Sequence, residues 1–221
     1  MSVPAVMLTS NASGAVESAK LGYVVMIVDI IDMSTTLEAL MDAGAASVFG
    51  ASPDNATPPV SINPENIGYI AGSKAQQLGT DIVVVAEPRI GSDQDRQQNI
   101  TGLRRGIQQS GARMGALVPN LGAETPGLVE VSGRVVIAAT GTGGVAYDAA
   151  MTAGAPAVIT GTVARTRFKR GTRPAKDSAQ RALTLAKKLN TGIAVVAASG
   201  NSLEDILAAE YILKLIMEQW G

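Results

Sequence analysis

The sequence predicts an α/β fold, a three-layer α/β/α arrangement in which helices cover both faces of a largely parallel sheet. Short apolar runs rich in β-branched residues alternate with longer helical patterns along the chain. The apolar runs are continuous rather than alternating, which is typical of parallel strands buried on both faces. A strand–loop–helix–strand unit occurs twice, at residues 24–50 and 134–161.

The two copies of this unit share sequence as well as pattern. The ten-residue windows that begin at Ala39 and Ala149 have six identical residues, including Gly44 and Gly154. An internal duplication of βαβ units is one explanation, and the common Ala/Gly-rich composition of such units is the other. With a duplication, the single α/β domain of residues 1–221 consists of two related halves, about 1–111 and 112–221.

The predicted elements follow one another in a regular order. Strands are expected at residues 23–28, 82–86, 114–118, 135–139, 157–160 and 193–197, with a weaker one near 47–50. Helices are expected at residues 35–43, 65–78, 95–110, 145–153, 174–189 and 203–219. Ser34 is expected to cap the first helix and Gly44 to end it in the left-handed conformation. Asn190 ends the fifth helix, and Ser202 precedes the last one.

Two further segments allow alternatives. Residues 51–64 contain four prolines and are predicted to form a surface loop or a connection between lobes. The last helix carries a broad apolar stripe, which indicates either core packing, the interpretation we favour, or the interface of a homodimer.

Composition excludes several classes of chemistry. The chain has no Cys and no His, which removes thiolate nucleophiles, Ser-His-Asp catalysis and His-ligated metals. The 18 basic and 19 acidic residues give a net charge of −1, so we expect neither nucleic acid nor a membrane surface as a partner. No signal peptide pattern and no apolar run of the ~18 residues needed for a membrane span occur, which favours a cytoplasmic location.

Polar loops at predicted strand ends are the candidate site, because open α/β sheets bind ligands there. The first loop contains Asp29 and Asp32, two carboxylates with which a Mg²⁺ ion could be held. Its hydroxyl residues open a helix and could receive a phosphate or sulfonate oxygen; they are Ser34, Thr35 and Thr36. An ordinary Asp/Ser helix cap is the alternative.

Three other segments complete the candidate site. The glycine-rich turn at residues 140–144 could bring backbone amides close to an anion, or could simply be a tight turn. Glu87 and Arg89 follow a strong strand, where a solvated loop is the alternative. A basic stretch could bind an acidic group, or could be a solvated loop or subunit contact; it contains Arg165, Arg167, Lys169, Arg170 and Arg173.

The ordered set of loops resembles the 2-phosphosulfolactate phosphatase family. DIIDMSTT resembles that family's Asp-x-x-Arg-x-Ser/Thr-Thr-Thr loop, and AEPR resembles its Gly-Glu-Arg segment at Glu87. Asn99, in NIT, resembles the Asn of that family's Asn-Ser-Pro. AATGT resembles its Thr-Thr-Asn-Gly-Thr turn at Gly141 and Thr142. ASGNSLED resembles its late helix start, with Glu204 and Asp205. These pieces span nearly the whole chain in the family's order.

The resemblance implies an α/β fold and a Mg²⁺-dependent phosphatase that converts 2-phospho-3-sulfolactate to sulfolactate and phosphate, a step of coenzyme M biosynthesis. The chain departs from the family pattern at Asp32 and Thr140, where the family has Arg and Asn. It also has Pro88 for an Arg, and Arg165 near the place of an Asn. The alternative is therefore a divergent member that binds an anionic metabolite without hydrolysing it.

The leading hypothesis is a Mg²⁺-dependent, phosphatase-like hydrolase acting on a small phosphorylated acid. Asp29, with Asp32 or Glu87, would hold the metal, and Asp205 or Glu204 would position or activate water. The phosphoryl group would be bound by a set of small residues, and Arg89 and Arg165 would offset its charge. The expected substrate-binding residues are Ser34, Thr35, Thr36, Arg89, Asn99, Thr140, Gly141, Thr142 and Arg165.

Overall fold

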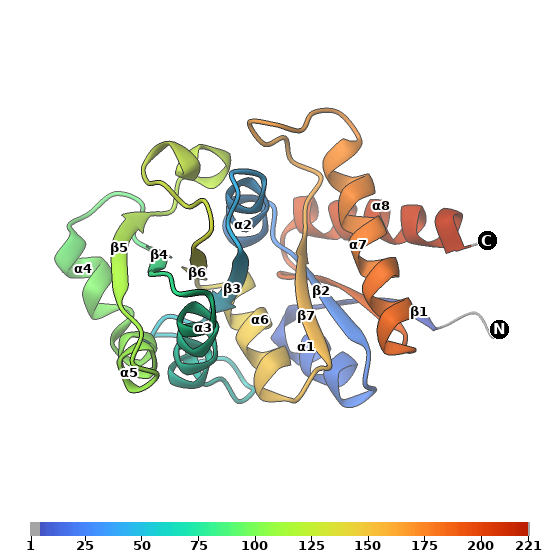
Figure 1. Ribbon diagram of the computed structural model, residues 1–221. Coiled ribbons are helices and arrows are strands. Elements are labelled where there is room, and N and C mark those ends of the chain that lie inside the picture. Colours follow the sequence, from blue (N-terminus) through green and yellow to red (C-terminus); the bar gives the residue numbers. More distant parts are fainter. Residues whose placement is uncertain (1–4, 221) are drawn as a thin grey trace.

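A computed structural model describes residues 5–220 and contains two four-stranded sheets in which all neighbouring strands are parallel (Figure 1). We call them sheet A and sheet B. Sheet A has the order β1 (Val6–Ser10), β8 (Ile193–Ala197), β2 (Val24–Val28) and β7 (Ala157–Gly161). Sheet B has the order β3 (Ser47–Ala51), β6 (Val135–Ala139), β4 (Ile82–Ala86) and β5 (Met114–Pro119).

Helices cover both faces of each sheet, which confirms the predicted α/β/α class. The outer face of sheet A packs against α7 (Arg173–Leu189) and α8 (Leu203–Trp220). The outer face of sheet B packs against α3 (Pro64–Leu78) and α5 (Thr101–Gln109). The inner faces of both sheets share one core with α1 (Asn11–Lys20), α2 (Met33–Asp42) and α6 (Gly143–Thr152). The prediction was a single sheet, whereas the structure has two sheets that share the central helices.

The strands alternate between these cores, as the two-residue period of a strand requires. In β2, Val25 and Ile27 face the shared core, while Val24, Met26 and Val28 face α7 and α8. Both faces are apolar, which explains why the sequence shows continuous apolar runs. The short helices α4 (Asp93–Gln98) and η1 (Gly122–Gly127) complete the described part of the chain.

The two repeated units connect the sheets in opposite directions. β2-α2-β3 leads from sheet A to sheet B, and β6-α6-β7 leads from sheet B back to sheet A. The sheets have the same order when β1, β8, β2 and β7 are matched with β5, β4, β6 and β3. Each sheet thus combines strands from both sides of residue 111, so the predicted boundary does not separate the two sheets.

Most predicted elements lie within a few residues of the observed ones, with three differences. The N-terminal pair β1 and α1 was not predicted, because α1 is a short Ala/Ser/Gly-containing segment with a weak apolar stripe. The helix expected at residues 95–110 is divided between α4 and α5, since the chain leaves helical geometry at Ile100, with φ −127° and ψ 27°. Ser34 does not cap α2; it lies inside the first turn, and Asp32 holds the N-cap position.

Other predicted helix ends are confirmed. Gly44 and Asn190 have φ values of +98° and +52°, as expected of residues that end helices in the left-handed region. Ser202 Oγ accepts a 3.2 Å hydrogen bond from the Asp205 amide at the start of α8.

The apolar stripe of α8 is only partly buried. Ile212 and Ile216 are buried in the core, whereas Leu203 is 64% exposed.

Residues 52–63 contain no helix or strand, as predicted for the proline-rich segment. None of the helices in the described part of the chain combines the length and apolarity that a membrane crossing requires.

Candidate functional site

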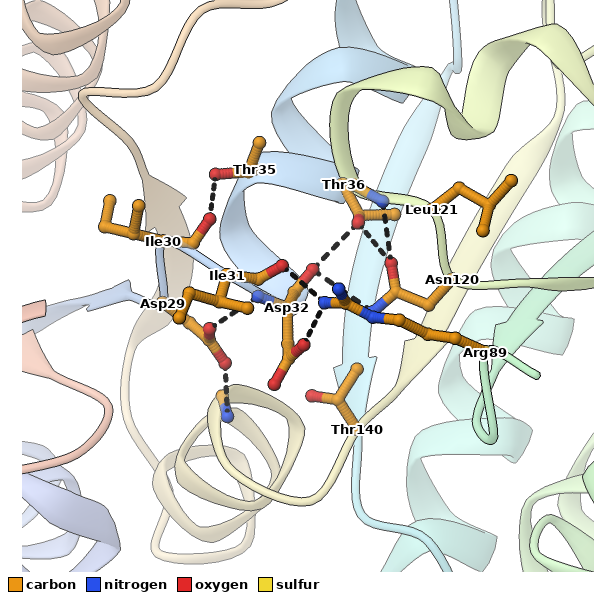
Figure 2. Close-up of polar contacts among 12 residues, drawn as sticks. Asp29, Ile30, Ile31, Asp32, Thr35, Thr36, Arg89, Asn120, Leu121 and Thr140 are labelled. Atoms are coloured by element: carbon orange, nitrogen blue, oxygen red, sulfur yellow. Dashed lines mark hydrogen bonds and ion pairs between the residues drawn. The ribbon is translucent and has the colours of Figure 1, made fainter. Parts of the chain in front are cut away.

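Asp29 lies where the first turns of two helices meet. It directly follows β2 and is 2% exposed. Its Oδ2 accepts a 2.7 Å hydrogen bond from the amide of Gly143, the first residue of α6. Its Oδ1 accepts a 2.9 Å hydrogen bond from the amide of Asp32, the N-cap of α2. Both helices therefore direct the positive ends of their dipoles toward one carboxylate (Figure 2).

The environment of Asp29 strongly changes its titration. Burial raises its pKa from the ordinary 3.8 to about 6, and the nearby carboxylates of Asp205 and Asp32 act in the same direction. The amides of Asp32 and Gly143 oppose this rise because they stabilise the ionised form. Asp29 therefore titrates close to neutral pH, where a proton-transfer group is most useful.

Asp32 forms an ion pair with Arg89 across the two sheets. The same guanidinium nitrogen, Nη2, also donates a 2.7 Å hydrogen bond to the Ile31 carbonyl oxygen. The side chains of Asp32 and Arg89 remain 28% and 41% exposed. In Figure 2 the Arg89 side chain extends from the loop after β4 to the carboxylate of Asp32. The sequence placed both residues in the site but gave no sign that they pair.

Asn120, which the sequence analysis missed, connects these loops from the end of β5. It is fully buried, accepts a 2.5 Å hydrogen bond from Thr36 Oγ1 and donates one of 3.3 Å to the Asp32 carbonyl oxygen. The available signal was an Asn directly after an apolar strand, at the same edge as Glu87.

Glu87 and Asp205 have equivalent positions in the two sheets. Glu87 follows β4, the neighbour of β6, and Asp205 follows β8, the neighbour of β2. Burial raises the pKa of Glu87, which Asp32 raises further, while Arg89, the Gly141 amide and Asn120 lower it. Burial likewise raises the pKa of Asp205, whose Oδ1 accepts a 2.8 Å hydrogen bond from the Ile30 amide. The two carboxylates thus interact with the loops that follow β6 and β2.

The predicted hydroxyl ligands are buried and bonded within the fold. Ser34 Oγ donates to the Ile27 carbonyl oxygen at 2.8 Å, and Thr35 Oγ1 donates to that of Ile30 at 2.6 Å. Thr36 Oγ1 bonds with Asp32 and Asn120, and Thr140 Oγ1 accepts a 2.9 Å bond from the Gly144 amide. These contacts favour a role for the four residues in fixing the loops.

The remaining predicted residues lie in separate parts of the structure. Thr142 is the N-cap of α6, and its side chain makes no capping hydrogen bond. Asn99 lies beside Glu87 and donates a 3.2 Å hydrogen bond to its carbonyl oxygen. Arg165 instead pairs with Glu124 of η1 at 3.7 Å. Glu204 is exposed in the first turn of α8, next to Asp205.

An open hollow of about 520 Å³ adjoins this cluster. Its lining residues come from the loop after β4 and from α4; they are Glu87, Pro88, Arg89, Asp95, Gln98 and Asn99. Gly141 is exposed, and no heavy atom would lie within 4 Å of a Cβ added to it. A small polar molecule therefore has access to Glu87 and Arg89, and the turn at Gly141 leaves room beside it.

The carboxylates do not assemble into a metal centre built from protein side chains alone. Within residues 5–220, no group of three or more Asp or Glu side chains is arranged to hold a metal ion. The hypothesis requires only Asp29 with Asp32 or Glu87, a pair of carboxylates that this finding does not test. A Mg²⁺ ion held by one or two carboxylates, with water and phosphate as its other ligands, stays a prediction.

Comparisons of the sequence with known proteins gave no match, neither to a family model nor to a curated protein. The resemblance to the 2-phosphosulfolactate phosphatase family thus rests on the ordered motifs alone.

Proposed function

We propose that this protein is a phosphatase-like hydrolase that releases phosphate from a small phosphorylated acid. The observation that carries the proposal is the arrangement of Glu87 and Arg89 at the hollow, where Asp32 acts on both. A carboxylate with a raised pKa and a guanidinium are the groups that proton transfer and phosphate recognition need in a chain without His or Cys.

In the proposed reaction, Arg89 binds the phosphoryl oxygens, and the exposed turn at Gly141 provides space for the ester. Glu87 accepts a proton from the attacking water as the water oxygen bonds to phosphorus. The ester P–O bond breaks, and the alcohol oxygen takes a proton from solvent. Asp29 is a positioning residue, since its two oxygens fix the starts of α2 and α6 around the site.

A bound Mg²⁺ would supply positive charge that offsets the carboxylates around the phosphate. Glu87, which lines the hollow, is the carboxylate that would contribute to its shell, because both oxygens of Asp29 already accept hydrogen bonds from amides and Asp32 pairs with Arg89. We also propose a cytoplasmic location and a homodimer for this protein. Its candidate substrate is 2-phosphosulfolactate, whose hydrolysis is a step of coenzyme M biosynthesis.

The alternative is a protein that binds an anionic metabolite without hydrolysing it. Three departures from the family pattern favour it, at Asp32, Thr140 and Arg165. A rise in melting temperature with phosphorylated acids, but no phosphate release, would support this alternative.

The experiment that tests the proposal is phosphate release from a panel of small phosphorylated acids that includes 2-phosphosulfolactate, with and without Mg²⁺. Release from one compound, dependent on Mg²⁺, is the expected result. No release across the panel from folded protein would overturn the hydrolase proposal.

A further inference from the structure

The Asp32–Arg89 ion pair uses only one carboxylate oxygen and one guanidinium nitrogen, so each side chain keeps polar atoms with which it could bind a ligand. Only Asp32 Oδ1 contacts Arg89, and within the described residues no hydrogen bond reaches Asp32 Oδ2. In Figure 2 this second oxygen is turned away from Arg89, toward the side on which Thr140 lies. One acceptor of a partly exposed carboxylate is therefore available to a cationic group.

Arg89 likewise uses only part of its guanidinium group. Its Nη2 makes both contacts, to Asp32 and to the Ile31 carbonyl oxygen. In the described part of the chain, Nε and Nη1 make no hydrogen bond, and Arg89 lines the hollow of about 520 Å³. The contact to the Ile31 carbonyl oxygen also fixes the guanidinium in place, so its remaining donors are oriented before a ligand arrives.

Where no Mg²⁺ is bound, the charges around this pair disfavour a ligand that carries only negative charge, such as 2-phosphosulfolactate. Several carboxylates repel one another here. Asp205 and Asp32 both act on Asp29, and Asp32 also acts on Glu87. Arg89 is the cation that acts on Glu87. A ligand that brings its own positive charge would relieve this imbalance, whereas a purely anionic one would add to it.

We propose that Asp32 and Arg89 form a recognition element for a zwitterionic phosphomonoester, in which an ammonium group binds Asp32 Oδ2 and the phosphate binds Arg89. Phosphorylated amino acids and phosphorylated amino alcohols are the substrate class with this chemistry. The inference rests on the proposed function for the location of the ligand, and it does not depend on whether the ester is hydrolysed.

The test compares two ligands that differ in one group. O-phospho-DL-serine carries an ammonium where DL-3-phosphoglycerate carries a hydroxyl, and titration calorimetry measures the Kd of each. We expect the wild-type protein to bind phosphoserine at least about tenfold more tightly, which is the discrimination that one charge-assisted contact supports. Asp32→Asn should reduce the preference to less than about threefold by weakening phosphoserine binding.

Asp81→Asn is the matched control, since Asp81 forms another partly exposed pair, with Arg113, at the opposite end of β4. It should leave both Kd values unchanged. Arg89→Gln, the second variant, should weaken both ligands, because both carry the phosphate that Arg89 binds.

Phosphate release measured in parallel separates this inference from the proposed function. Preferential binding without release supports the inference and overturns hydrolysis. Release without preference for the ammonium compound overturns the inference and leaves the hydrolase in place. Equal binding of the two compounds, binding of neither, or an Asp32→Asn variant that binds both more tightly would also overturn the inference, the last because Asp32 would then only block Arg89.

Discussion

The amide of Gly143 donates a 2.7 Å hydrogen bond to Asp29 Oδ2, which joins the first residue of α6 to the end of β2. This contact links an element that leaves sheet B to an element of sheet A. The absence of a side chain at Gly143 permits it. A Cβ added there would lie 2.3 Å from Asp29 Oδ2 and 2.8 Å from Met33 Cβ.

Gly143→Ala should therefore destabilise the protein by about 1–3 kcal/mol, because the buried contacts around Asp29 must shift to admit the methyl group. Urea unfolding measures the change. Gly141→Ala is the matched control in the same turn, since a Cβ at Gly141 meets nothing within 4 Å. Equal effects of the two substitutions would contradict the assigned packing.

The raised pKa of Asp29 predicts how stability depends on pH. The folded protein holds this proton up to a pH of about 6, whereas the unfolded chain releases it near 3.8. The free energy of unfolding should therefore decrease as pH rises between these values, by roughly 3 kcal/mol from Asp29 alone. Asp29→Asn should make the curve flatter over this window, because Asn does not titrate.

Asp95→Asn is the control for this experiment. The Ser92 amide lowers the pKa of Asp95, so its contribution to stability changes only below pH 3.8. Its replacement should leave the slope between pH 4 and 6 as it is. A wild-type slope that Asp29→Asn does not alter would show that Asp29 does not carry the shifted proton.

Glu38 and Arg181 form an ion pair between α2 and α7, in which the carboxylate is buried and the Arg181 side chain is 30% exposed. Glu38 is 3% exposed and also accepts a 2.7 Å hydrogen bond from Thr160 Oγ1. Arg181→Ala removes the ion-pair partner of this buried carboxylate and should cost about 1–3 kcal/mol of unfolding free energy. Adding Glu38→Gln should restore much of the loss, as thermal or urea unfolding would measure.

The exposed pair of Lys214 and Glu218, at 3.9 Å, provides the comparison. Lys214→Ala should change stability by less than about 0.5 kcal/mol, because solvent screens an exposed pair. A similar cost for Arg181→Ala would mean that the Glu38–Arg181 pair is not structural.

Asp42, the last residue of α2, binds two residues of the basic loop between β7 and α7. It accepts a 2.6 Å hydrogen bond from Thr166 Oγ1 and pairs with Lys169 Nζ at 2.8 Å. Asp42→Ala should release this loop and speed tryptic cleavage after the exposed Arg165 and Arg167, as mass spectrometry would detect. Asp81→Ala, which removes a carboxylate far from the loop, should not. Unchanged cleavage in Asp42→Ala would indicate that other contacts hold the loop.

The sequence predicted the fold class because strand and helix signals are local. Continuous apolar runs and helix-ending residues such as Gly44 and Asn190 depend on neighbours along the chain, and they were placed correctly. The division into two sheets could not be predicted this way. It depends on α2 and α6 each crossing between sheets, and nothing in either local sequence states which strand a helix will reach.

The candidate site divides in the same manner. Asp29, Glu87 and Asp205 were named from the loops that follow strands. The structure places Asp29 and Glu87 directly after strands and Asp205 in the first turn of α8, all with raised pKa values. The Asp32–Arg89 pair and Asn120 depend on contacts across 57 and 88 residues, which no spacing rule reports. Arg165 followed a strand too, but its loop continues along α2 and brings it to Glu124 instead.

In the proposed reaction, Glu87 accepts a proton during phosphate release. The most direct measurement of this role compares phosphate release by the wild-type protein and by Glu87→Gln across pH. Wild-type release should fall as pH decreases through the raised pKa of Glu87, since only the ionised carboxylate accepts a proton. Glu87→Gln should lose release by about 100-fold or more while keeping its melting temperature. Undiminished release by a folded Glu87→Gln variant would contradict a role of Glu87 in proton transfer.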